Sequence, residues 1–174
     1  MDNHKHLRRL TLDAMFLGAA LMLAFAEALL PPLPFLGVKL GLANLATLCC
    51  AYAVGLADAA LVALARWLLS GLLFGSGTSL LFSLAGTVCV LAVLLFLRIT
   101  GTGRLSFVGI SVLTAAGHNL GQLLCAALLY GWGTGILQGY GALLLLAGTF
   151  CGLLSGWLCN LLFRRMGELL KPER

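Results

Sequence analysis

Three polar side chains fall within five positions of a strongly apolar segment. In "TAAGHNLGQLL", residues 114–124, they are His118, Asn119 and Gln122. Residues four apart share one face of a helix, so His118 and Gln122 lie together, with Asn119 beside them. Such a group can hydrogen-bond a polar ligand and fix its orientation. The same pattern has a second interpretation, in which these side chains hold neighbouring helices together by hydrogen bonds.

A charged residue, Arg66, interrupts a second apolar segment, "ALARWLLSGLLFGSG". Arginine stays charged, and a charge at the centre of a bilayer costs roughly 2.5–3.5 kcal/mol. The side chain therefore needs an acidic partner, backbone carbonyls or a bound anion. Glu27 is the best internal partner, but Lys39, just across the "PPLP" loop, competes for it.

One acid facing two cations predicts a cavity that accepts an anion. Arg66 and Lys39 would hold the anion, and Glu27 would neutralise the empty cavity. The alternative is a structural ion pair between Glu27 and Arg66, while Lys39 extends its ammonium group to the membrane surface.

The composition identifies the environment of these residues. The 174-residue chain is 61% hydrophobic and only 10% charged, whereas soluble domains are about 45–50% apolar and about 25% charged. A membrane span needs about 20 apolar residues, and the sequence predicts six such spans in one membrane domain covering residues 1–174. Their approximate limits are 12–30, 38–55, 57–75, 79–97, 107–130 and 136–163.

The basic residues predict the orientation of this all-α, six-helix bundle. Positively charged loops stay in the cytoplasm. With both termini inside, all Lys and Arg except Lys39 and Arg66 lie on the cytoplasmic side, and the net charge of +5 needs no nucleic acid to explain it. In this orientation four helices offer polar groups at similar depth. The predicted substrate-binding residues are Glu27, Lys39, Asn44, Arg66, His118, Asn119 and Gln122.

The first span carries small residues at four-residue spacing, as Ala14 with Gly18 and as Ala20 with Ala24. Such pairs allow close contact between helices, within the protein or with a partner protein. The six cysteines all fall within predicted spans and form no C-x-x-C pair, so they are predicted to be packing residues rather than metal ligands.

The sequence contains no serine–histidine–acid arrangement, no intramembrane acid pair and no nucleotide-binding motif. We therefore predict no catalytic residue, no metal and no cofactor in this chain. Any use of ATP would need another protein.

Three segments carry a resemblance to a known family. They are "GVKLGLANLATL", Arg66 followed by "LLFGSG", and "ISVLTAAGHNLGQLL". Over about residues 10–163 the chain resembles the small bacterial membrane family labelled heptaprenyl diphosphate synthase component I, also called Gx transporter. That family is similar to the S components of energy-coupling factor (ECF) transporters.

The resemblance implies a six-helix protein of the bacterial cytoplasmic membrane. Such a protein captures a small molecule from outside and docks on a module of one transmembrane coupling protein and two ATPases. The family label implies a second role, as a subunit of a prenyl diphosphate synthase. Those enzymes bind magnesium diphosphate through aspartate-rich motifs, whereas this chain has only the scattered Asp2, Asp13 and Asp58. The label suggests an isoprenoid or quinone precursor as the solute. A stand-alone carrier is the third possibility.

Overall fold

A computed structural model describes residues 2–29, 42–101, 105–131, 133 and 141–165. This part of the chain is entirely helical and contains no strand. The helices are α1 (Asp2–Ala28), α2 (Asn44–Ala53), α3 (Leu56–Phe74), α4 (Gly77–Thr100), α5 (Phe107–Tyr130) and α6 (Gly141–Arg165). All-α architecture is therefore confirmed.

Five of these helices are long and apolar enough to cross a membrane, as a multi-pass membrane protein requires. The exception is α2, which has 10 residues and a length of about 15 Å, half of a bilayer core. The predicted second span, 38–55, begins outside the described residues, so six crossings and the membrane orientation stay predictions. The first helix starts earlier than the predicted 12–30, because polar residues with good helix propensity extend it from Asp2.

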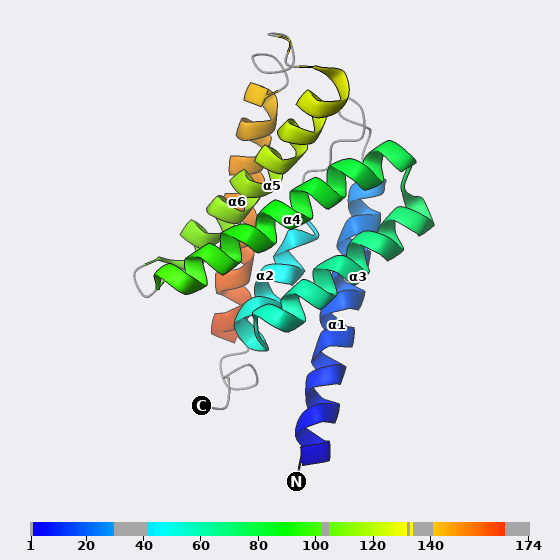
Figure 1. Cartoon of the computed structure of the whole chain (residues 1–174). Helices are drawn as coiled ribbons and strands as arrows, with labels where there is room; N and C mark the ends of the chain where they lie inside the picture. The colour runs from blue at the N-terminus through cyan, green and yellow to red at the C-terminus, as the bar shows by residue number, and fades with distance from the viewer. Residues whose placement is uncertain (1, 30–41, 102–104, 132, 134–140, 166–174) are drawn as a thin grey trace.

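Side chains on the outside of the bundle are consistent with a lipid environment. Large apolar residues such as Leu72, Ile99 and Leu128 are 70%, 76% and 79% exposed. Soluble monomers rarely leave apolar surface uncovered on this scale. The arrangement in Figure 1 places the beginning of α1 and the end of α6 at the same end of the bundle.

Glycine stripes set how closely α5 packs against its two neighbours. A side chain at Gly121 would overlap the backbone of Ala85 in α4, and one at Gly156 on α6 would lie 2.6 Å from the Cα of Val108. The glycine face of α5 therefore packs directly against α4. The stripe on α6, formed by Gly148, Gly152 and Gly156, fits α5 in the same way.

Serine and glycine residues mark the helix ends. Ser76 and Ser106 each accept a hydrogen bond from the backbone N–H three residues later, as N-caps do. Gly101 and Gly131 follow α4 and α5 with φ of 80° and 87°, which other residues rarely adopt. These ends fix the length of the two helices that flank the polar interior.

Candidate functional site

Arg66 lies in the middle of α3 with only 3% of its surface exposed. Its Nη2 donates a hydrogen bond to Oγ1 of Thr87 on α4, over 3.0 Å. Its Nε has no hydrogen-bond partner among the described residues, and no described carboxylate oxygen lies within ion-pair distance, 4.0 Å, of its guanidinium. Within the described residues, the buried guanidinium thus hydrogen-bonds to one neutral hydroxyl.

Glu27 supplies negative charge from a second helix. It lies near the end of α1, is 8% exposed, and interacts electrostatically with Arg66. It also interacts electrostatically with Cys151 of α6. The carboxylate of Glu27 is thus within electrostatic range of side chains on both α3 and α6. The alternative of a direct Glu27–Arg66 ion pair is not what the structure contains.

The polar cluster of α5 packs against α4 next to the residue that accepts the hydrogen bond from Arg66. The Nε2 atoms of His118 and Gln122 are 2.9 Å apart, and both side chains are buried. The imidazole ring fits because residue 86 of α4 is glycine, where a Cβ would overlap it. The next residue, Thr87, accepts the hydrogen bond from Arg66. Two consecutive residues of α4 therefore join the His118–Gln122 pair to Arg66.

Asn119 has a different partner from its two neighbours. Its Nδ2 donates to the backbone carbonyl of Leu144 on α6 over 2.6 Å, and the absence of a side chain at Gly148 makes room for it. This bond is the interhelical link that the sequence offered as the second interpretation. The structure therefore places the amide nitrogen of Asn119 in the α5–α6 contact.

Asn44 begins α2 and faces a small hollow between α2, α5 and α6. The hollow has a volume of about 10 Å³ and is also lined by Ser111, Thr114 and Ser155. That space holds one water at most. Further along α2, Thr47 is fully buried, and its Oγ1 has no hydrogen-bond partner in the described part of the chain.

The remaining predicted residues fall in different places. Lys39 lies outside the described residues. Ala20 and Ala24 are buried inside the bundle, at 0% and 3% exposure, whereas Ala14 and Gly18 are exposed. Alanines that face their own helices cannot contact a partner, so only Ala14 and Gly18 of the four stay available for one.

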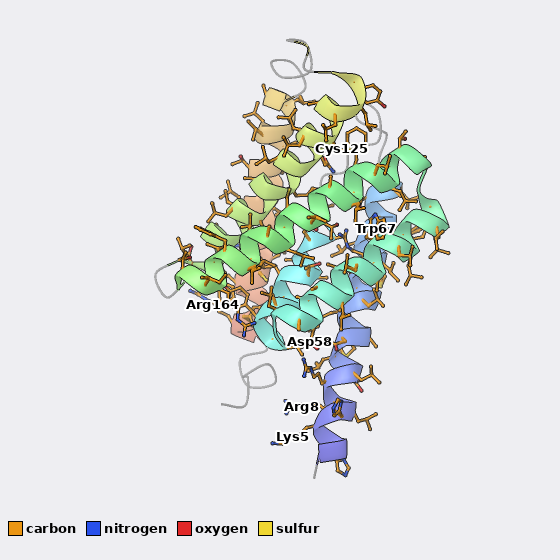
Figure 2. All side chains as sticks on the ribbon, in the orientation of Figure 1. Lys5, Arg8, Asp58, Trp67, Cys125 and Arg164 are labelled. Carbon is orange, nitrogen blue, oxygen red and sulfur yellow. The ribbon has the colours of Figure 1, made fainter. Side chains whose placement is uncertain are left out.

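A second arginine marks the end of the bundle where α1 begins. Both Nε and Nη2 of Arg9 donate to the carboxylate of Asp58 over 2.7 Å. Figure 2 shows Asp58 at this end, with Lys5 and Arg8 on α1 and Arg164 on α6. Among the described residues no group of three or more His, Cys, Asp or Glu side chains is placed to hold a metal ion.

Comparison with protein families gives one match. The family described as heptaprenyl diphosphate synthase component I matches residues 16–162, most of the chain. The chain belongs to this family. Neither the curated proteins nor the solved structures gave a match.

The family and the helices together indicate a membrane-associated component of heptaprenyl diphosphate synthase. The word "component" in the family description implies a partner subunit. All the residues around Arg66 described above come from the matched region of this component I chain.

Two buried polar residues, Thr47 and Thr87, were not singled out by the sequence analysis. Isolated hydroxyl groups are common in membrane helices, where they usually bond the backbone of their own helix. Only the position of Thr87 opposite Arg66 reveals its role. The sequence predicts a depth in the membrane for the polar groups, but it does not predict their neighbours across the bundle.

Proposed function

We propose that this chain is the substrate-binding subunit, or S component, of an ECF-type uptake transporter in the bacterial cytoplasmic membrane. It captures a small solute that is anionic at one end and partly apolar, such as an isoprenoid or quinone precursor or a vitamin. The observation that carries the proposal is Arg66, a buried cation whose hydrogen-bond partner within the described residues is a single hydroxyl.

The energetic argument concerns what this guanidinium still lacks. It has five N–H donors, and a carboxylate or phosphate can accept two of them side by side. Thr87 accepts one bond, and Nε has no partner within the described chain. A buried charge that is incompletely paired is strongly unfavourable. An anionic solute would supply both the missing charge and the missing acceptors.

The other residues keep the roles expected from the sequence, apart from Asn119. Lys39 would assist Arg66 in holding the anionic group. Glu27 would neutralise the empty site and give way when the anion binds. His118, Gln122 and Asn44 would orient the solute, and Asn119 would hold α5 against α6 through its bond to Leu144.

Transport would need further proteins. The sequence has no nucleotide-binding motif, so ATP would be consumed by two partner ATPases through a transmembrane coupling protein. The exposed Ala14 and Gly18 on α1 are our candidates for contact with that coupling protein. No cofactor or metal is required in this chain, and no residue in it is assigned a catalytic role.

A binding measurement with a prenyl diphosphate tests the proposal. Purified protein in lipid nanodiscs is titrated with geranyl diphosphate as the probe, alongside Arg66→Gln, Arg66→Lys and the exposed-site control Arg164→Gln. We expect binding by the wild type and the control, weaker binding by Arg66→Lys, and loss in Arg66→Gln. Normal binding by a folded Arg66→Gln protein would refute the anion site. Failure of that variant to insert would favour a structural role for Arg66.

The family description favours a second candidate, a non-catalytic membrane subunit of a prenyl diphosphate synthase. Affinity purification from the native membrane separates the two. Recovery of two ATPases and a coupling protein supports the transporter subunit, whereas recovery of a soluble prenyl synthase supports the second candidate. Uptake by proteoliposomes that contain this chain alone would instead indicate a stand-alone carrier.

A further inference from the structure

Two cysteines from distant parts of the chain meet inside the bundle. Cys49 on α2 and Cys159 on α6 have their Sγ atoms 2.7 Å apart, and both are buried, at 2% and 0% exposure. We propose that Cys49 and Cys159 are a redox pair that an oxidant closes into a disulfide between α2 and α6. This inference is independent of the proposed transport function.

The geometry distinguishes this pair from ordinary packing. Non-bonded carbon atoms pack best at about 3.5–4.0 Å, and a disulfide bond measures about 2.05 Å. The two sulfur atoms lie between these values, so a movement of less than about 1 Å would join them. The two residues are 110 positions apart in the chain, and α2 and α6 otherwise touch through few residues. A bond here would add a link that the fold otherwise lacks.

The chemistry balances with a hydroperoxide as oxidant. One thiol loses its proton as its sulfur attacks a peroxide oxygen, the O–O bond breaks, and the departing hydroxide takes up that proton, so that a sulfenic acid and one water form. The second thiol then attacks the sulfenic sulfur, the S–O bond breaks, and the disulfide and a second water form. Two thiols and hydrogen peroxide thus give one disulfide and two waters. The sulfur atoms lose two electrons and the peroxide oxygens gain them.

A route for a small uncharged oxidant lies beside the pair. Leu94, Leu97 and Ile110 pack in the same core cluster as Cys49 and Cys159. The same three side chains line a hollow of about 350 Å³ between the ends of α2 and α4 and the starts of α3 and α5. These three side chains thus border the hollow and belong to the cluster that contains the two cysteines. Because disulfides of intracellular proteins are usually transient and redox-sensing, we expect the pair to rest as thiols.

Thiol counting on the full chain tests this inference. Protein in nanodiscs is treated with hydrogen peroxide, denatured, and labelled with a maleimide for mass spectrometry. The chain has six cysteines, so we expect the number of labelled thiols to fall from six to four and to return to six after reduction by dithiothreitol. Peptide mapping should identify the Cys49–Cys159 bond.

Serine variants provide the controls. Cys49→Ser and Cys159→Ser should each keep five labelled thiols, whereas Cys50→Ser and Cys125→Ser should each fall from five to three. The inference fails if the folded wild type keeps six thiols while the unfolded chain loses them under the same treatment. It fails equally if the loss persists in Cys49→Ser, because another pair would then be the one that reacts.

Discussion

Two arginines of this chain, Arg9 and Arg66, are held in opposite ways. Arg9 lies at the end of the bundle with 53% of its side chain exposed, and it makes two bonds to one carboxylate. Arg66 lies in the interior with 3% exposure, and it makes one bond to a hydroxyl. The arginine that most needs a countercharge is thus the one without a direct carboxylate partner.

The different contacts of the two arginines indicate a structural role for Arg9 and a ligand-binding role for Arg66. A bidentate arginine–carboxylate pair is a complete interaction, and at an exposed position it stabilises the fold only slightly. A buried arginine without such a pair is a cost to the fold. The chain could have placed an acid opposite Arg66, as it does opposite Arg9, but position 87 is threonine. We infer that the place of such an acid is left for the anionic group of a solute.

The largest expected effect on ligand binding comes from giving Arg66 a carboxylate partner, as Arg9 has. Thr87→Asp places a carboxylate beside the guanidinium, in place of the hydroxyl that now accepts its hydrogen bond. The new ion pair should weaken binding of geranyl diphosphate by about 30-fold or more, since charged hydrogen-bonded partners are worth about 2–5 kcal/mol. It should also raise the melting temperature. Titration and thermal unfolding in nanodiscs measure both.

Thr78→Asp is the matched control, because it introduces the same charge at an exposed position on the first turn of α4. It should leave ligand affinity unchanged. Equal affinity in Thr87→Asp and Thr78→Asp would show that the anion does not bind at Arg66.

A smaller effect should follow from moving His118 without changing it. A Cβ on Gly86 would overlap the imidazole ring, so Gly86→Ala must displace the His118–Gln122 pair while Arg66 and Thr87 keep their residue types. We expect about tenfold weaker binding, the loss of one hydrogen bond to a charged group. Gly77→Ala on the same helix, where a Cβ meets nothing within 4 Å, should bind normally. If the two variants bind alike, His118 does not orient the solute.

Much of this architecture could be predicted from sequence. The five long apolar helices follow from composition and hydropathy. Arg66, His118 and Gln122 stand out because lipid penalises them, and all three are buried. The length of α2 was overestimated within the described residues, because hydropathy alone does not show where a helix starts.

Lateral contacts were beyond such reasoning. Asn119 and Gln122 are equally polar and three positions apart. Yet Asn119 forms a hydrogen bond to α6, whereas Gln122 forms one with His118. Ala20 and Ala14 belong to equivalent small-residue patterns, but one faces inward and the other outward. The pairing of Cys49 with Cys159 depends on how α2 meets α6, which no local spacing encodes.

The comparison also predicts a modest gain of affinity from removing the negative charge near Arg66. Glu27→Gln should bind geranyl diphosphate about threefold to tenfold more tightly, because the anion no longer competes with a carboxylate for the same cation. Asp13→Asn, on the same helix but near Arg9, should have no such effect. Titration at two salt concentrations checks the electrostatic origin. The difference in affinity between Glu27→Gln and the wild type should shrink only slightly at the higher salt concentration, because buried charges are screened little. Weaker binding by Glu27→Gln would show that Glu27 contacts the solute instead of neutralising the empty site.

The smallest effect on binding should come from the other arginine. Asp58→Asn removes the charge that holds Arg9, and because that pair is half exposed, we expect the melting temperature to fall by only about 2–4 °C. Ligand affinity should not change, since the pair lies at the end of the bundle and Arg66 lies in its middle. The exposed Arg8→Gln, one residue from Arg9, serves as the control for a change of charge at this end. If Asp58→Asn weakens binding as strongly as Thr87→Asp does, the two arginines belong to one coupled system. The separation of a structural arginine from a ligand-binding arginine would then be wrong.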